Sequence, residues 1–177
     1  NAAEIEISNG GCQSQIKPNY NYPQNVNGIY LTLTAAVADF NLRGVTGPTR
    51  FLLTDTLYST GETFPILVKI ANEVNHTTTT NTLTIKPNTG VNAVITGVVP
   101  GSQIIRVLES NVIIDGSNTT SGTTRNLTIQ NTSTTTPSVV YVASVGTTPI
   151  TNVTLKNSTI INGITSSSAV ILRDSTS

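Results

Sequence analysis

The chain has 177 residues, with 9 basic and 9 acidic side chains, so its formal net charge is zero and only 10% of its residues are charged. This balance argues against a nucleic-acid partner, which needs a basic surface, and no window reaches the roughly 18 apolar residues of a membrane span. Thr and Asn supply much of the polar surface, a composition that predicts an extracellular or cell-surface protein.

Residues 1–26 are expected to form an extended segment. Residues 3–7 alternate apolar and charged side chains in the manner of a half-buried strand, and the Asn and Gly residues that follow indicate a turn. Through Ile5 and Ile7, this strand could lie along the cap of its own domain or be exchanged onto the sheet edge of a neighbouring subunit. Cys12 is the only cysteine, so the chain forms no internal disulfide and no cysteine-based zinc site.

Residues 27–80 are expected to form an N-terminal cap. Apolar spacing predicts a helix at 35–43, with Thr34 as its N-cap and Gly44 at the position of a left-handed stop. Strands are predicted before the helix at 29–33, and after it at 49–54, 57–58 and 64–70. The helix would cover the apolar end of the repeats that follow.

From residue 81 to 177 short strands recur in three sets, with a period of about 30 residues. The first set contains 82–85, 111–115 and 151–156, the second 93–95, 126–130 and 159–163, and the third 104–108, 139–143 and 169–172. Three strands per period predict an all-β fold, a right-handed parallel β-helix of about three coils with an N-terminal capping helix. An antiparallel sandwich is the competing interpretation, which the scarcity of tight hairpin signals disfavours.

Several stretches carry a resemblance to a known family. They are LTAAVADFNLRGVTGPTRFLLTDTLYSTGETFPILVKI, NTLTIKPNTG, NVIIDG and RNLTI. From residue 27 to 177 the chain resembles the N-terminal part of secreted right-handed β-helix proteins of the pectate-lyase-like superfamily, and most closely large surface proteins of Bacteroidetes-type bacteria. The resemblance implies the fold. It does not imply an activity, because the superfamily contains lyases, hydrolases and structural proteins.

The functional residues of the enzymatic members have no counterpart here. Those members need clustered acidic residues for calcium with an arginine base, or paired aspartates with a histidine. Asp115 is the only acidic residue of the first strand set, and Lys86 and Lys156 occupy its equivalent positions. We therefore predict no catalytic residue, no cofactor and no metal site.

The remaining polar residues give one binding hypothesis. The third strand set contains Arg106, Tyr141 and Arg173, which could bind a sugar by stacking and hydrogen bonding. His76 is expected to be solvated in its Thr-rich loop. Glu109 and Asp174 are also expected to be solvated, with a weak calcium site as the alternative.

Three functions are compatible with these patterns. The first is a non-enzymatic extracellular structural module whose last coil, with Val170 and Leu172, joins the N-terminal strand of the next subunit in a head-to-tail filament. The second is a carbohydrate-binding or adhesive surface module that takes a polysaccharide. The third is the N-terminal part of a polysaccharide lyase or hydrolase whose catalytic coils lie beyond residue 177.

Overall fold

The computed structural model describes residues 3–7, 28–71 and 75–173. Predictions about Cys12 and Asp174 therefore lie outside the described residues. One helix and fourteen strands are described: β1 (Ala3–Ile7), β2 (Gly28–Tyr30), α1 (Leu33–Arg43), β3 (Thr49–Leu53), β4 (Leu57–Tyr58), β5 (Ile66–Val68), β6 (Leu83–Pro87), β7 (Ala93–Gly97), β8 (Ile105–Val107), β9 (Val112–Asp115), β10 (Leu127–Asn131), β11 (Val140–Ala143), β12 (Thr154–Lys156), β13 (Ser158–Asn162) and β14 (Val170–Arg173).

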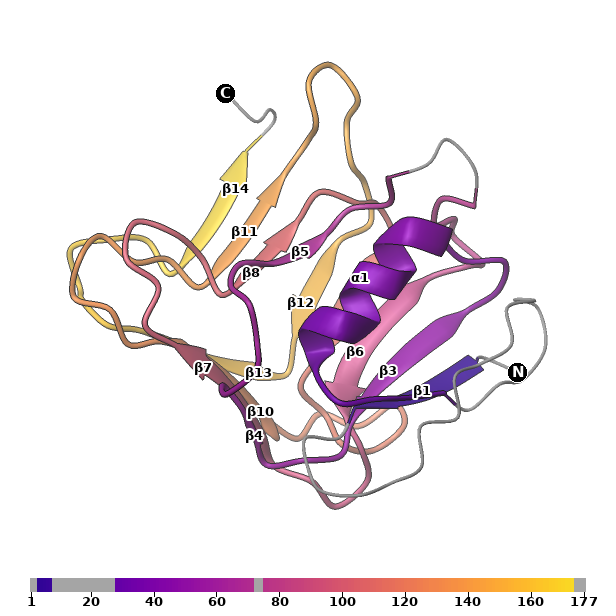
Figure 1. Cartoon of the computed structure of the whole chain (residues 1–177), viewed down its shortest axis with the longest axis horizontal. Helices are drawn as coiled ribbons and strands as arrows, with labels where there is room; N and C mark the ends of the chain where they lie inside the picture. The colour runs from indigo at the N-terminus through magenta and orange to yellow at the C-terminus, as the bar shows by residue number, and fades with distance from the viewer. Residues whose placement is uncertain (1–2, 8–27, 72–74, 174–177) are drawn as a thin grey trace.

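The strands form three parallel sheets that face one another around a common interior (Figure 1). Sheet A has the order β12-β9-β6-β3-β1-β2, sheet B the order β13-β10-β7-β4, and sheet C the order β14-β11-β8-β5. The chain visits the sheets in the order A, B, C on every pass, and we call one such pass a coil. The three strand sets predicted from the sequence are confirmed as neighbours within sheets A, B and C.

The described residues form four such coils, so the expected number of about three is too low. Strands β3, β4 and β5, which the sequence pattern assigns to the cap, pair with β6, β7 and β8 and form coil 1. Coils 2, 3 and 4 follow as β6–β8, β9–β11 and β12–β14. The period of coil 1 is hard to recognise because β4 has two residues and β5 has three.

Inward side chains of successive coils stack on one another and make the core. In sheet A, Ile5, Phe51, Ile85 and Ile114 occupy matching register positions, and each is at most 2% exposed. Strand residues alternate between buried and partly exposed side chains in β3, β6 and β10. This alternation follows from the two-residue period of a strand with one face in the core.

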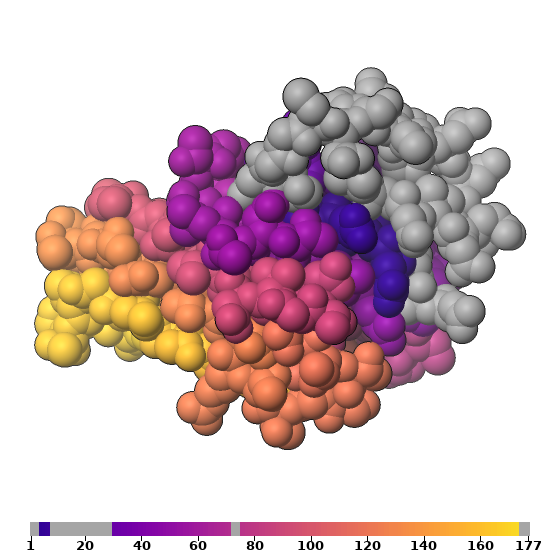
Figure 2. Space-filling model, turned by 90° about the horizontal axis from the view of Figure 1, so that it is seen from below, coloured from indigo at the N-terminus to yellow at the C-terminus, as the bar shows by residue number. Residues whose placement is uncertain are grey.

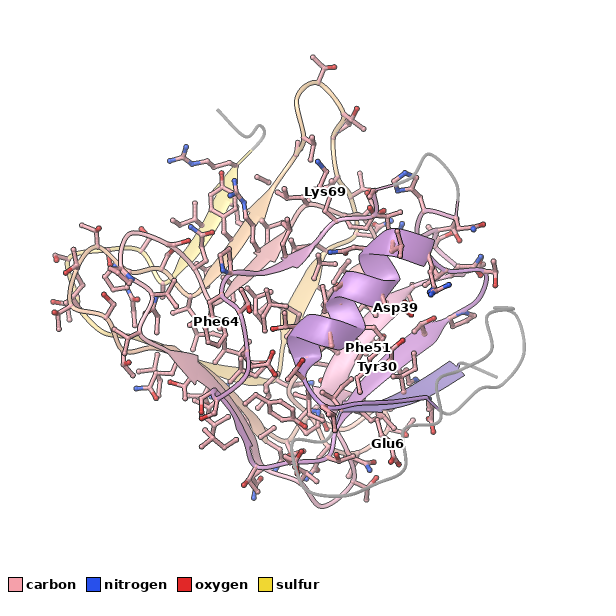
Figure 3. The ribbon with its side chains drawn as sticks, in the orientation of Figure 1. Glu6, Tyr30, Asp39, Phe51, Phe64 and Lys69 are labelled. Atoms are coloured by element: carbon pink, nitrogen blue, oxygen red, sulfur yellow. The ribbon has the colours of Figure 1, made fainter. Side chains whose placement is uncertain are left out.

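Helix α1 covers the core at the end of the stack where β1 lies (Figure 1). Its buried residues are Leu33, Ala36, Val37 and Phe40. The Phe40 ring meets Phe51 edge to face, with centroids 6.3 Å apart, and Figure 3 shows Phe51 beneath the helix. Among the described residues, no helix has the length and apolar character required to cross a membrane.

The start of α1 differs from the sequence prediction. The N-cap is Thr32, whose side chain accepts a hydrogen bond from Ala35 N at 3.0 Å, and the helix begins at Leu33. The Glu62 carboxylate accepts hydrogen bonds from the backbone N–H groups of Leu33 (2.8 Å) and Thr34 (2.7 Å). Glu62 comes from a distant loop, so local spacing could not reveal that it stabilises the earlier start. The predicted stop is confirmed: Gly44 has a φ of 68° and its N–H bonds Phe40 O.

Asparagines turn several corners between the strands. Asn111 and Asn152 precede β9 and β12 and have φ values of 51° and 57°, in the left-handed region that asparagine tolerates. The Asn152 side chain donates to Asn111 Oδ1 at 3.1 Å, and Asn126 donates to Asn92 Oδ1 at 2.6 Å. Asparagine side chains of successive coils are therefore joined by hydrogen bonds at these two corners.

Candidate functional site

A polar groove of about 320 Å³ crosses the outer face of sheet A. Outward side chains of β1, β3, β6, β9 and β12 form its floor, and the loop after β9 forms one wall. We refer to it as the sheet A groove. Figure 2 shows the surface of the molecule turned by 90° from the view of Figure 1. The lining residues of the groove are Glu4, Arg50, Leu52, Thr84, Lys86, Pro87, Asn88, Thr89, Ile113, Asp115, Asn118, Thr120, Ser121 and Lys156.

Strand register brings these residues together from distant parts of the sequence. Glu4 pairs with Arg50, Arg50 with Thr84, and Thr84 with Ile113, which makes one outward row across four strands. Asp115 pairs with Lys156 in a second row. Because neighbouring strands lie about 4.8 Å apart, each row presents a new side chain at that interval along the groove.

Charges in the sheet A groove are matched locally. Arg50 Nη1 lies 3.1 Å from Glu4 Oε1, and Lys156 Nζ lies 3.4 Å from Asp115 Oδ2. Lys86 Nζ instead donates to the backbone carbonyl of Thr119 at 3.1 Å. Both members of the Arg50–Glu4 pair are well exposed, so this pair contributes little to folding and is free to exchange partners. The groove therefore offers donors and acceptors without a strong field of one sign.

Asp115 is the most constrained charged residue of the groove. It is 7% exposed, and its Oδ1 accepts hydrogen bonds from Ser117 N (3.0 Å) and Asn157 Nδ2 (2.8 Å). Burial alone raises the pKa of Asp115. The hydrogen bonds from Asn157 and Ser117, together with the charge of Lys156, outweigh burial and hold the pKa below its usual value. The Asp115 side chain is therefore an anion at neutral pH.

The two carboxylates of the groove do not form a catalytic pair. Glu4 on β1 and Asp115 on β9 are separated by β3 and β6 in sheet A, which corresponds to about 14 Å at the usual strand spacing. Glycosidases hold their two carboxyl groups about 5 to 9.5 Å apart. Among the described residues no group of three or more His, Cys, Asp or Glu side chains could hold a metal ion.

The predicted binding residues come together only in part. The Arg106 guanidinium carbon lies 4.8 Å from the centroid of the Tyr141 ring, and the two residues are register partners in sheet C. Tyr141 is itself 8% exposed, so its ring is covered and does not offer a free face on which a sugar could stack. Arg173 lies opposite Ala143 and not opposite Tyr141, which pairs with Ile171.

The predicted assembly residues fall into two groups. Ile5 and Ile7 are buried in the core of their own chain, where β1 pairs with β3 and β2. Tyr58 donates its hydroxyl hydrogen bond to Ile7 O, which ties β1 to coil 1. Val170 and Leu172 are 40% and 74% exposed, although their register partners Val140 and Val142 belong to the core or pack against it.

A second polar cluster was missed by the sequence analysis. His76 Nδ1 lies 3.1 Å from Glu109 Oε1, beside a cavity of about 550 Å³ at the corner between sheets C and A. Glu109 is 6% exposed and also accepts from Thr77 Oγ1 and Ile70 N, so the expectation of a solvated Glu109 is wrong. His76 and Glu109 lie on adjacent coils about one period apart, and that spacing is the only sequence signal that could have paired them.

Comparisons with known proteins add no identification. No protein-family model, no curated protein and no solved structure matches this chain.

Proposed function

We propose that the chain is a right-handed parallel β-helix that works as a non-enzymatic extracellular module and binds an extended glycan in the sheet A groove. The fixed A, B, C order of the sheets supports the β-helix, since parallel crossover connections are right-handed in about 98% of cases. The resemblance to secreted β-helix proteins of the pectate-lyase-like superfamily supports the same fold and an extracellular location.

The observation that carries the glycan proposal is the composition and shape of the sheet A groove. Its floor extends across five parallel strands, so a long ligand meets a new side chain on each. Its walls offer amides, hydroxyls and locally paired ions, which can exchange hydrogen bonds with sugar hydroxyls. Leu52 and Ile113 provide the small apolar surface against which sugar ring carbons could pack.

Absence of catalysis is part of the proposal. The separation of Glu4 and Asp115 supports it, as does the engagement of Asp115 with Lys156 and Asn157. A general acid needs a raised pKa, whereas the pKa of Asp115 is lowered.

Self-association is the second candidate function, and one observation favours it. Coil 4 leaves inward residues of β14 open to solvent, with Leu172 74% exposed. A second subunit could add strands to the outer edges of β12, β13 and β14. Because β1 is already held in its own sheet, an exchange of β1 would first require the loss of its bonds to β2 and β3. Fibres in negative-stain microscopy at high protein concentration would support this candidate, and a monomer by light scattering would contradict it.

Calorimetric titration with a panel of soluble cell-wall glycans tests the glycan proposal. We expect at least one glycan to bind, and both Arg50→Ala and Lys156→Ala to weaken it about five- to tenfold, which is the loss of roughly 1 kcal/mol of hydrogen bonding. Lys69→Ala is the control, because it also removes one cation but lies at the corner between sheets C and A. Absence of binding to the whole panel, or equal losses with Lys69→Ala, would contradict the proposal.

A further inference from the structure

The wall of the sheet A groove is a loop that its own backbone holds only weakly. It follows β9 and runs from Ser117 to Thr124, and Asn118, Thr120 and Ser121 line the groove. The backbone hydrogen bond described within it joins Gly122 N to Thr119 O at 3.4 Å, close to the limit of a useful bond. Ser121 has a φ of 55°, a left-handed conformation that serine adopts at a cost. Within the loop the buried Ser117 hydroxyl bonds Thr119 O at 3.3 Å and Thr124 Oγ1 at 3.1 Å. Contacts from outside the loop add to these bonds in fixing its shape.

Those contacts come from three different coils. Lys86 of coil 2 donates to Thr119 O at 3.1 Å, and Asn157 of coil 4 donates from Nδ2 to Gly122 O at 3.2 Å. Asp115 of coil 3 accepts from Ser117 N, the first N–H of the loop. Asn157 Nδ2 also donates to Asp115 Oδ1. The Asp115 carboxylate therefore orients the Asn157 side-chain amide, which binds the loop at Gly122 O.

The corner where the loop begins is tightly packed. A side chain at Gly116 would place its Cβ 1.8 Å from Asn157 O, so the two residues are in close contact across the coils. Asp115, Gly116 and Asn157 thus form one packed unit, with Lys156 Nζ on the second carboxylate oxygen at 3.4 Å.

We propose that Asp115 is the positioning residue of the sheet A groove: its carboxylate charge holds Ser117, Asn157 and Lys156 in the arrangement that gives the loop its ligand-binding shape. The consequence for a ligand depends on the proposed glycan function, whereas the effect on the loop does not. The charged groups that face Asp115 are Lys156 from β12 and Lys86 from β6, and Arg50 and Glu4 lie further along the groove. Asp115 acts here on other protein groups, and no bond is made or broken.

Hydrogen exchange of the amides between 116 and 126, measured on the whole chain without ligand, tests the inference. Asp115→Asn keeps an acceptor oxygen and removes only the charge, so we expect protection in this segment to fall about three- to tenfold. Asp115→Ala removes the acceptor as well, and we expect a loss of more than tenfold. Lys69→Ala should leave the segment unchanged.

The pH profile separates a positioning charge from a merely structural side chain. In the native protein, protection of the loop should decrease in acid only below the usual titration range of an aspartate, because hydrogen bonds and Lys156 hold the pKa of Asp115 below its usual value. In Asp115→Asn that acid-dependent decrease should disappear. Native protection of the segment in Asp115→Asn, or an unchanged acid profile, would overturn the inference. A changed loop together with no binding to any glycan would leave the positioning role standing and would remove the proposed ligand.

Discussion

Val170 lies directly opposite Val140 in the register of sheet C, yet Val140 is 1% exposed and Val170 is 40% exposed. Both side chains point toward the interior, and Ile105, one coil below, is fully buried in the same row. The difference arises because Val140 has coil 4 above it, whereas no described strand covers Val170.

The row of Ile105, Val140 and Val170 predicts that truncating an inward side chain costs less stability the closer the residue lies to coil 4. Ile105→Ala should reduce the free energy of unfolding by about 2 to 5 kcal/mol, because it leaves a cavity in a packed core. Val170→Ala should cost less than about 1 kcal/mol, because its side chain already meets solvent. Denaturant unfolding of both variants measures the difference. Equal costs would show that coil 4 is covered in solution, as self-association requires.

Asn131 is predicted to be a buried polar residue on which the stability of the fold depends. It is fully buried, and its side chain accepts from Val99 N while it donates to the carbonyls of Val99 and Ser138. Asn131→Ala leaves these groups unpaired, so we expect a loss of about 3 kcal/mol in unfolding free energy. Asn162→Ala is the matched control one coil above, where the residue is partly exposed and the substitution should cost about 1 kcal/mol. A smaller loss at Asn131 than at Asn162 would contradict this account.

Glu62 is predicted to stabilise the capping helix from outside. Its carboxylate accepts hydrogen bonds from the N–H groups of Leu33 and Thr34, which have no partner within the helix. A negative charge at this end of α1 also interacts favourably with the helix dipole. Glu62→Gln should lower the free energy of unfolding by about 1 kcal/mol, and Glu62→Ala by about 2 kcal/mol. The urea midpoint measures both changes, and a midpoint equal to that of the native protein would show that the cap does not need this carboxylate.

Tyr58 predicts how stability changes at alkaline pH. Burial raises the pKa of Tyr58 to about 12, with a further contribution from the charge of Asp55. Below pH 10 the hydroxyl is protonated in both the folded and unfolded chain, so its stabilising contribution is complete. Between pH 10 and 12 only the unfolded chain releases the proton, and stability falls by at most about 1.4 kcal/mol per pH unit.

Tyr58→Phe should flatten this alkaline decline. Unfolding by urea at pH 9, 10 and 11 measures the slope in both proteins. At pH 9 the variant should also be less stable, because Ile7 O loses the hydroxyl that holds β1. Parallel slopes for the two proteins would indicate that the phenol is hydrated in the folded state.

Much of the fold could be predicted because it repeats. Inward residues such as Ile114 and Ile129 alternate with polar ones, and the same pattern returns once in every coil, so the strand neighbours of coils 2 to 4 were recognisable from spacing alone. Coil 1 was harder, because its two shortest strands give almost no alternation. The start of α1 depended on Glu62, whose contribution is visible only in three dimensions.

The candidate site was less predictable than the fold. The repeat places Asp115, Lys86 and Lys156 at equivalent positions, but the spacing gives no sign that these residues share one groove with Glu4 and Arg50. A one-residue change of register would have turned each of them to the other face. Arg106 and Tyr141 were correctly expected to be neighbours, but the burial of the tyrosine ring depends on how the arginine lies over it.

The most direct test of the account is chemical-shift mapping of the ¹⁵N-labelled chain during titration with a glycan from the panel. We predict that the shifted amides cluster on sheet A and the loop after β9, around Arg50, Lys86, Asp115 and Lys156. The assignment of the sheet A groove as the glycan site would be contradicted if the shifted amides lay only in sheet C near Arg106 or only at the edge of coil 4 near Leu172. It would also be contradicted if no amide shifted.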